Sequence, residues 1–504
     1  MVAIAYSVAF EGVEARLVEV QCAVAAGLPT FSIVGLPDKA VSEARERVRA
    51  AFGALAIALP SRRLTVNLSP ADLPKEGSHF DLPIALAVLA ALEIIPAEEL
   101  ARCVSLGELA LDGRLVPVAG ALPAALAASQ EDRALICPRA CGAEAAWIEQ
   151  VPVLAPATLR EVIEHLTDRA PIAAARAGMV QDSPGTLCLS DVKGQERAKR
   201  AMEIAAAGRH HLLMVGPPGA GKSMLAARMP GLMPPLSARE ALETSMIHSL
   251  AGTLGHGGIT RRPPFQDPHH TASSPAIVGG GPKARPGQIS LAHNGVLFLD
   301  ELPEFDRKVL ETLRQPIETG EVVVSRANAH IRYPCRFLLV AAANPCRCGQ
   351  LADPARACAR APVCGSDYLN KISGPLMDRL DLRLEVPGVS LQDLDLPNSG
   401  ETSAQVATRI AAARDIQARR FQDEVGVQVN ADASGPLLDQ IAAPDDAGRV
   451  LIHKAAERLG LTARGYHRIL RTARTIADLE GSTKVHVHHL AEAISYRLPF
   501  VAGG

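Results

Sequence analysis

The stretch His211-Leu-Leu-Met-Val-Gly-Pro-Pro-Gly-Ala-Gly-Lys-Ser-Met-Leu-Ala226 decides the fold of the central part of this chain. Its apolar run Leu212–Val215 is typical of a buried strand, and a helix pattern rich in Ala, Met and Leu follows the glycines. Between them the residues fit G-x-x-x-x-G-K-[ST], in which backbone N–H groups surround phosphate oxygens. Lys222 would reach the β and γ phosphates, and Ser223 would bind Mg²⁺. We therefore predict a P-loop that binds a nucleoside triphosphate through Gly216, Pro217, Pro218, Gly219, Ala220, Gly221, Lys222 and Ser223.

Two further apolar runs end in side chains suited to the same chemistry. Gly295-Val-Leu-Phe-Leu-Asp-Glu301 is typical of a buried strand that ends in two carboxylates. Because ligands bind at the carboxyl ends of parallel strands, we expect Asp300 to hold Mg²⁺ and Glu301 to orient or deprotonate the attacking water. The run Phe337–Ala343 ends in Asn344, which is placed to orient water beside the γ-phosphate. The sequence predicts a site for ATP hydrolysis, with ATP and Mg²⁺ as cofactors.

Composition restricts the other possibilities. The 504 residues are enough for about three domains, and 48% hydrophobic residues support packed cores. A net charge of −2 makes any DNA contact a local patch. Ten cysteines in so long a chain are not a disulfide scaffold. The N-terminus lacks a basic leader, and the longest apolar stretch, Leu82–Leu92, is too short to cross a bilayer. We expect a cytoplasmic protein with no membrane contact.

Residues 1–168 alternate strand-like and helix-like patterns, which favours a separate α/β or α+β domain. The stretches Leu73–Leu86 and Leu106–Val118, the second a predicted hairpin turning at Asp112-Gly113, resemble the Lon-protease domain of ribosomal S5-like topology. That resemblance puts His79 at the position of the nucleophilic Ser and Leu122 at that of its partner Lys. We therefore expect a Lon-like domain without the protease dyad, acting as an accessory module.

The segment after this domain leads into the P-loop region. Residues 169–188 are rich in Ala, Gly, Pro, Ser and Asp without a sustained period, which is typical of a linker. Asp191–Ala206 then resembles the entry segment and first helix of AAA+ ATPases. In the long stretch 232–290, His269 and His270 have no carboxylate or thiol at ligand spacing. For them a structural or nucleic-acid-contacting role is favoured over metal binding.

A helix pattern at Glu304–Thr319 precedes Gly320–Tyr333, which is typical of a β-hairpin. Basic side chains lie by its predicted tip and on its arms, and these are our candidate DNA contacts: Arg326, His330 and Arg332. Farther on, Ser373–Leu382 contains Arg379, which has the look of an arginine finger aimed at the γ-phosphate of a neighbouring subunit. A surface salt bridge explains Arg379 equally well.

Four cysteines cluster just after Asn344, as Cys346-x-Cys348-x₉-Cys358-x₅-Cys364. Four thiols in a short loop fit a Cys₄ zinc site, although the first spacing is unusually short and the last unusually long. The alternative is reduced cysteines in a basic loop. Another group, His486, His488 and His489, resembles a metal site on paper, but two adjacent residues at a helix start do not easily share an ion, so we expect a structural role.

Helical periodicity dominates the end of the chain after a Pro/Ser/Gly break, and the pattern over 463–480 is the clearest. Together with the P-loop, the carboxylate strand, the hairpin, Asn344-Pro-Cys and Ser373–Leu382, this segment resembles the YifB/ComM family of magnesium-chelatase-like AAA+ ATPases nearly end to end. The resemblance implies an AAA+ core over 189–392 and a helical lid over 403–504. It also implies a role for Arg464 as the sensor-2 arginine that touches the γ-phosphate.

The same resemblance implies a function. Members of this family are expected to form rings, most simply hexamers, with ATP between subunits, and to drive branch migration of DNA during recombination of incoming DNA. The partners would be single-stranded or branched DNA and further copies of the chain. A chelatase-type motor that remodels a protein or inserts a metal is the alternative, although such subunits lack a Lon-like domain. An ATP-dependent protease is disfavoured by His79 and Leu122.

Overall fold

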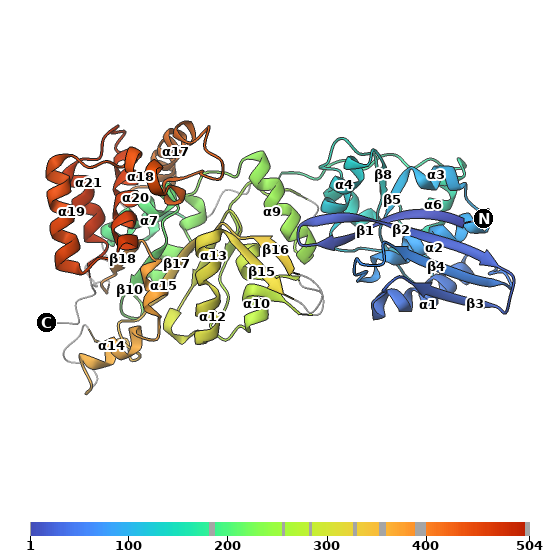
Figure 1. The fold of residues 1–504 in the computed structure, drawn as a ribbon, viewed down its shortest axis with the longest axis horizontal. Helices are drawn as coiled ribbons and strands as arrows, with labels where there is room; N and C mark the ends of the chain where they lie inside the picture. The colour runs from blue at the N-terminus through green and yellow to red at the C-terminus, as the bar shows by residue number, and fades with distance from the viewer. Residues whose placement is uncertain are drawn as a thin grey trace.

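The computed structural model describes residues 2–180, 187–254, 258–281, 285–325, 330–351, 359–388 and 400–498, with only the backbone described for Ser325 and His330. Figure 1 shows two lobes along the long axis of the molecule. The N-terminal residues form the lobe on the right, and the P-loop region and the C-terminal helices form the lobe on the left.

The N-terminal lobe contains a seven-stranded sheet in the order β3-β4-β2-β1-β5-β8-β9. Strands β1, β2 and β4 are antiparallel neighbours, while β3 joins β4, and β5, β8 and β9 continue from β1, as parallel strands. Its strands are β1 (Val2–Glu11), β2 (Glu14–Ala25), β3 (Thr30–Val34), β4 (Arg63–Ser69), β5 (Cys103–Ser105), β8 (Ala134–Ile136) and β9 (Val153–Leu154). The helices are α1 (Lys39–Ala54), α2 (Asp81–Ala91), α3 (Ala97–Ala101), α4 (Ala121–Gln130), α5 (Arg139–Ala145) and α6 (Leu159–Leu166).

The predicted hairpin at Asp112-Gly113 is confirmed, with β6 (Glu108–Leu109) paired to β7 (Leu115–Val116). The glycine has a φ of +84°, which a turn of this kind requires and which other residues rarely adopt. Helix α2 is buried on every side, as its uninterrupted apolar run predicts. Its buried Asp81 pairs with Arg47 through two hydrogen bonds of 2.6 and 2.9 Å.

The two positions aligned with the protease dyad lie in the interior of this lobe. His79 is buried against the ring of Phe80, and its Nε2 donates to the carbonyl of Val8 at 2.9 Å. Leu122 is fully buried among the apolar side chains under α4. Neighbouring groups are engaged elsewhere, since Ser78 donates to Glu108 and the buried Lys75 donates to the carbonyl of Pro70. At positions 79 and 122 the structure therefore holds a hydrogen-bonded histidine and a core leucine, and the role of the lobe as an accessory module stays a prediction.

The second lobe is built on a parallel five-stranded sheet in the order β11-β14-β17-β10-β18. Side chains alternate across it, because Leu212 and Met214 of β10 join one apolar cluster while Leu213 and Val215 join the other. Both faces are therefore buried, as expected for a parallel sheet. The strands are β10 (Leu212–Val215), β11 (Phe265–Gln266), β14 (Val296–Leu299), β17 (Leu338–Ala343) and β18 (Leu382–Glu385).

Helices and smaller elements cover this sheet. The predicted helix at Glu304–Thr319 is wrong as a single element, since the chain forms a 3₁₀ turn and two short helices there. Pro316 lacks an N–H and its ring clashes with the preceding turn, which explains the break. The elements are α7 (Glu196–Gly208), α8 (Lys222–Ala226), α9 (Ala238–Ala251), α10 (Ser274–Val278), β12 (Gly279–Gly280), β13 (Arg285–Pro286), α11 (Gln288–Leu291), α12 (Arg307–Thr312), α13 (Arg314–Thr319), α14 (Val363–Leu369) and α15 (Gly374–Asp378).

The predicted hairpin at Gly320–Tyr333 is present as β15 (Glu321–Ser325) paired antiparallel with β16 (His330–Pro334). Val322, Val324 and Tyr333 bury their side chains in the cluster on one face of the five-stranded sheet. The hairpin is therefore seated on the core by its apolar face.

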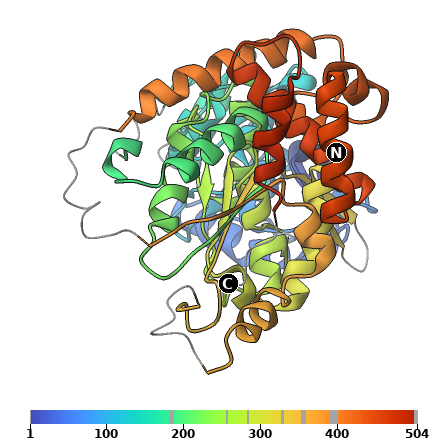
Figure 2. The ribbon, with the colours of Figure 1, turned by 90° about the vertical axis from the view of Figure 1, so that its left-hand side faces the viewer.

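The C-terminal residues form the helices predicted from their period. They gather on one side of the core in Figure 2, and α17 and α20 pack against α7. Polar caps fix where they begin, with Thr402, Asp445 and Thr462 accepting backbone N–H groups at the starts of α17, α19 and α20. The helices are α17 (Ser403–Arg420), α18 (Gly435–Ile441), α19 (Asp446–Leu459), α20 (Ala463–Leu479) and α21 (Val487–Ser495).

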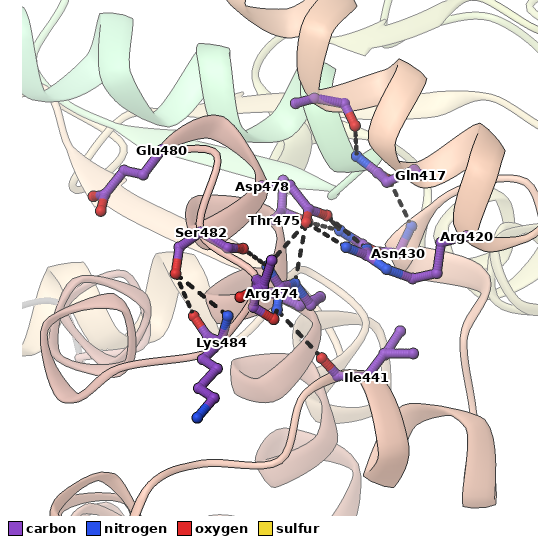
Figure 3. A network of polar contacts seen from close by, with 12 residues as sticks. Gln417, Arg420, Asn430, Ile441, Arg474, Thr475, Asp478, Glu480, Ser482 and Lys484 are labelled. Carbon is purple, nitrogen blue, oxygen red and sulfur yellow. Dashed lines mark hydrogen bonds and ion pairs between the residues drawn. The ribbon is translucent and has the colours of Figure 1, made fainter.

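A buried polar network ties these helices together (Figure 3). Asp478 of α20 accepts two hydrogen bonds from Arg420 of α17, at 2.6 and 2.8 Å, and one from Asn430 at 2.8 Å. Arg474, which is almost fully buried, donates to Asp478 at 3.1 Å and to the carbonyl oxygens of Ser482 and Thr483 beyond the end of α20. Asp478 and Arg474 are thus paired in the interior, while Arg420, whose side chain is 20% exposed, binds the same carboxylate from the edge of the network.

Replacing Asp478 by Ala should destabilise the C-terminal helices by roughly 3–5 kcal/mol, because it leaves the buried guanidinium of Arg474 and the partly buried guanidinium of Arg420 without their carboxylate. Thermal and denaturant unfolding followed by circular dichroism would measure the loss. Asp367→Ala removes a comparable carboxylate from an exposed pair with Arg360 and should change stability little. Equal effects of the two substitutions would contradict the importance given to the buried network.

Candidate functional site

The side chains predicted to handle ATP meet at the carboxyl edge of the five-stranded sheet. In the strand order, β17 lies between β10 and β14, so Asn344 at the end of β17 stands between the P-loop and Asp300. The structure therefore brings together three segments that are far apart in the sequence. This edge is where parallel sheets bind ligands.

Lys222 is buried at the centre of this group. Its Nζ donates to the carbonyl oxygens of Gly216 and Pro217 at 2.7 and 3.0 Å and to Oδ1 of Asn344 at 3.2 Å. Burial lowers the pKa of Lys222, while Asp300 and Glu301 act in the opposite direction. The ammonium group is thus held at the P-loop by neutral oxygen atoms, which negatively charged phosphate oxygens can replace.

Ser223 and Asp300 provide a pair of oxygen ligands suited to Mg²⁺. The Oγ atom of Ser223 donates to Oδ2 of Asp300 at 2.8 Å, so the two oxygens already face each other. A hydroxyl and a carboxylate from these positions are the donor set by which P-loop proteins hold the ion that accompanies the nucleotide. Bound there, Mg²⁺ would neutralise charge on the phosphates.

The P-loop glycines are needed for backbone shape. Gly219 and Gly221 have φ values of +77° and +84°, and a Cβ built on either meets no atom within 4 Å. Their left-handed conformation is the one that lets successive backbone N–H groups of a P-loop face phosphate oxygens, and the space beside both glycines is open. Gly216 serves another purpose, because a Cβ there would overlap the carbonyl oxygen of Val386 just beyond β18.

Glu301 has an unusual backbone and a histidine neighbour. Its φ of +51° is strained for a residue with a side chain, and its N–H donates to Oδ1 of Asp300 at 2.9 Å. The Nδ1 atom of His270 lies 3.5 Å from its Oε2. His270 thus contacts the carboxylate predicted to activate water, a contact that the sequence pattern alone did not suggest.

Two other contacts at the P-loop were missed from the sequence. Gln195, in the entry segment, has a left-handed φ of +61° and donates to the carbonyl oxygens of Pro387 at 2.6 Å and Ala220 at 3.4 Å. On the other side, a Cβ on Gly349 would lie 2.5 Å from Cδ of Pro218. The cysteine-bearing loop therefore packs directly on the P-loop. A Gly-Gln pair shortly before a P-loop was the available signal for the first contact.

Arg379 and Arg464 lie at the opposite, amino edge of the same sheet. Arg379 precedes β18, whose first residue pairs with the first residue of β10, and Arg464 lines a cavity of about 570 Å³ beside Phe337, which precedes β17. Both arginines bind one oxygen of Glu318, at 2.7 Å and 3.2 Å respectively. Neither is placed to touch the phosphate site of its own chain. Other arginines line the same cavity: Arg209, Arg336, Arg468 and Arg471.

The candidate DNA-contacting residues are only partly described. Arg326 lies outside the described residues, and the side chain of His330 does too, although its backbone pairs with that of Ser325. Arg332 is described, and its side chain is 75% exposed and 3.8 Å from Glu321. Among the described side chains of the hairpin, Arg332 is thus an exposed basic group whose ion pair with Glu321 is long and screened by solvent.

The prediction of zinc finds no support among the described thiols. The Sγ atoms of Cys346 and Cys348 are 3.1 Å apart, whereas two thiolates on one tetrahedral zinc are separated by about 3.8 Å. Cys358 lies outside the described residues, and Cys364 does not complete a compact group with the first pair. Within the described ranges, the one His/Cys/Asp/Glu group compact enough for an ion is Glu480, His488 and His489.

The hydrogen bonds of that group favour a structural role. Nδ1 of His489 accepts the backbone N–H of His486 at 2.9 Å, so its Nε2 carries the proton and donates to Glu480 at 2.9 Å. A protonated ring nitrogen has no lone pair for a metal. The contact closes the first turn of α21, in agreement with the structural role expected for these histidines.

The start of the P-loop strand is joined to α20 by buried groups. Asp381 accepts the backbone N–H of His211 at 2.9 Å and a hydrogen bond from Arg468 at 2.5 Å, and His210 shares a 2.7 Å hydrogen bond with Thr475. Burial would raise the pKa of Asp381, but Arg468 and the two histidines hold it well below its ordinary value. Burial lowers the pKa of both histidines to about 4.

Family models and curated relatives together match almost the whole length of the chain. Family models described as magnesium chelatase subunit ChlI, subunit ChlI of Mg-chelatase and the ChlI C-terminal region match residues 188–394, 18–141 and 400–497. The competence protein ComM of Haemophilus influenzae is 45% identical over 98% of this chain and 97% of its own length. YifB of Escherichia coli is 43% identical over 96% and 95%. The magnesium-chelatase 38 kDa subunit of Rhodobacter capsulatus is 28% identical over 61% of this chain and 87% of its own.

A parallel sheet that brings the P-loop sequence, Asp300 and Asn344 together at the ends of neighbouring strands, in a region that the magnesium-chelatase family model matches, defines an AAA+ core of the magnesium-chelatase type. The full-length similarity is more specific, and the chain belongs to the YifB/ComM family of magnesium-chelatase-like AAA+ ATPases. Membership supports ATPase activity with ATP and Mg²⁺. Within the described ranges, no helix is both long and apolar enough to cross a membrane.

Stability should fall as the pH decreases from about 6.5 to about 4. Because the pKa of His210 and of His211 is lower in the folded chain than in the unfolded chain, the unfolded chain takes up protons first in this range. Each histidine accounts for a loss on the order of 3 kcal/mol. Denaturant unfolding at several pH values would measure the slope, and His210→Gln should reduce it.

His453→Gln provides the control, because it makes the same replacement at an exposed histidine. Other buried histidines contribute to the slope in every variant, so the informative quantity is the difference between each variant and the parent. Identical slopes for His210→Gln and the parent would show that His210 is not held neutral by burial.

Proposed function

We propose that this protein is an ATP-driven DNA motor, a helicase that forms a ring, most simply a hexamer, and promotes branch migration in homologous recombination and natural transformation. The observation that carries the proposal is its 45% identity over nearly full length to a relative named as a competence protein. Natural competence is the uptake of DNA, so single-stranded or branched DNA is the expected substrate. The motor would act in the cytoplasm, where ATP and chromosomal DNA are found.

The β15–β16 hairpin supports a DNA contact. Its apolar face is buried on the ATPase core, so its other face is available to a ligand, and the exposed Arg332 is part of that face. In a ring, such hairpins from each subunit would surround a central strand and bind its phosphates without any overall basic charge. The net charge of −2 is compatible with this local mode of binding.

The arginines at the amino edge support a ring. Within one chain, Arg379 and Arg464 contact Glu318 and lie away from the P-loop at the other edge. If both act on a γ-phosphate, as their motifs imply, the phosphate must belong to a neighbouring subunit. The surrounding arginine-rich cavity suits an anion presented from outside the chain. On this interpretation, Arg464 and Arg379 would act on ATP bound to the same neighbouring subunit.

A chelatase-type motor subunit that remodels a protein or inserts a metal is the second candidate. The names of all three matching family models favour it. One observation opposes the chelatase interpretation. The chelatase subunit of R. capsulatus aligns with only 61% of this chain, although the alignment includes 87% of that subunit. More than a third of this chain therefore has no counterpart in that alignment. We favour the DNA motor for this reason.

ATP turnover should rise when single-stranded or branched DNA is added, and strand exchange on a branched substrate should require ATP. Glu301→Gln should retain nucleotide binding and lose turnover, because it removes the carboxylate that activates water. Lys222→Ala should lose binding as well. Nucleotide binding, phosphate release and movement of labelled branched DNA are the measurements. Turnover unaffected by every form of DNA would favour the chelatase-type motor.

Arg379→Ala should reduce hydrolysis by roughly 10³–10⁵ while ATP still binds, since an arginine finger acts only on the transition state. Mixing this variant with Lys222→Ala should restore part of the activity, because each subunit with an intact P-loop then meets a neighbour that has Arg379. Phosphate release from the mixture measures the recovery. No recovery in rings shown to contain both variants would mean that Arg379 does not act between subunits.

A further inference from the structure

The N-terminal lobe touches the β15–β16 hairpin directly. Figure 1 shows the paired strands β1 and β2 extending from the N-terminal lobe toward the core, beside β16 and α9. The turn between these strands consists of Gly12 and Val13, and it is the part that reaches the hairpin.

The contact is close at the level of the backbone. Gly12 has a φ of +67°, and a Cβ on it would lie 2.5 Å from the carbonyl oxygen of Arg332 and 3.3 Å from Cγ2 of Ile331. No side chain fits between the turn and strand β16. Val13 packs against the apolar cluster that also holds Val322 of the hairpin. The turn and the hairpin therefore share one packed surface.

A second contact fixes the orientation of the lobe. Leu242 and Met246 of α9 are partly buried and pack against the apolar cluster beneath α4, so this helix of the ATPase core lies directly on the N-terminal lobe. The N–H of Gly120 donates to the carbonyl of Ser249 at 3.2 Å, and the hydroxyl of the buried Ser249 donates to the half-buried Glu144. Moving the lobe away from the hairpin would expose these groups to water or leave them unpaired.

The hairpin needs such support, because β15 and β16 form a sheet of only two strands. Its apolar side is held by the core through Val324 and Tyr333, but the strand that carries Arg332 has its backbone against the N-terminal turn. The direction of this arm therefore depends on both lobes.

We infer that the β1–β2 turn is a positioning element for the hairpin. It braces β16 so that the basic arm of the hairpin keeps the geometry with which it binds DNA. This gives the N-terminal lobe a mechanical role in place of catalysis. The consequence for DNA rests on the proposed function, whereas the bracing of β16 does not.

Gly12→Ala tests the inference, and Gly113→Ala is its matched control. Both glycines occupy turns of the N-terminal lobe with positive φ, +67° and +84°, so the backbone strain is similar. A Cβ at Gly113 meets only Leu55, at 3.7 Å, whereas a Cβ at Gly12 collides with β16. Amide hydrogen exchange of the hairpin peptide covering both β15 and β16 should become at least about fivefold faster in Gly12→Ala alone.

The functional readout is the DNA concentration that gives half-maximal stimulation of ATP turnover. It should rise at least about fivefold in Gly12→Ala and stay at the parent value in Gly113→Ala. Turnover in the absence of DNA should be unchanged in both, because the atoms nearest to the added Cβ belong to Arg332 and Ile331 or to Leu55, and none of these residues is assigned to the ATP site. Unchanged exchange in Gly12→Ala would overturn the bracing. Faster exchange without a change in DNA dependence would overturn its role in DNA binding.

Failure of the proposed function gives a different result. If DNA does not stimulate the parent, the exchange measurement still decides whether the turn braces the hairpin. Should Gly12→Ala not fold, Val13→Ala removes apolar contact without placing a side chain at a glycine, and it should also accelerate exchange in the hairpin. Val34→Ala, at a half-exposed position in the same lobe, is the control and should leave exchange unchanged.

Discussion

The buried carboxylate of Asp381 is the interaction on which the arrangement of the ATPase lobe depends. It binds the backbone N–H of His211, where the P-loop strand begins, and the guanidinium of Arg468 in α20. Removing the side chain of Asp381 or of Arg468 would leave the charge of the other unpaired in the interior, which is costly. One end of β10 is thus tied to the C-terminal helices while its other end opens into the P-loop. Asp381 thus links these helices directly to the strand that leads into the phosphate-binding loop.

The sequence was sufficient for prediction where local pattern and chemistry coincide. The apolar run before Gly216 and the residues through Ser223 describe a strand and a loop whose conformations are locally determined, and the turn at Asp112-Gly113 is another such case. Prediction failed at Glu304–Thr319, where the apolar period suggested one helix but Pro316 interrupts the hydrogen bonding. The periodicity of apolar residues shows which face of a helix is buried, whereas the backbone hydrogen bonds decide whether the helix continues.

Contacts between segments that are distant in the sequence could not be predicted from the sequence. Glu318 belongs to a helix of ordinary composition, and only folding brings its carboxylate to two arginines from other elements. The cysteines show the converse, because their spacing suggests a metal site while the described thiols lack the separation that zinc needs. The spacing of cysteines along the sequence limits how far apart their backbones can lie, but it does not determine the directions of their side chains.

The division of functional groups between the two edges of the sheet has a consequence for the active unit. Lys222, Asp300 and Asn344 meet at the carboxyl edge, whereas Arg379 and Arg464 share Glu318 near the amino edge. Strands that keep a sheet rigid also keep its edges apart, so one chain does not unite both sets. If both arginines assist hydrolysis, the complete site exists only between two chains. Glu318 then has a physical role, because it holds the two cations side by side until the phosphate of a neighbour takes its place.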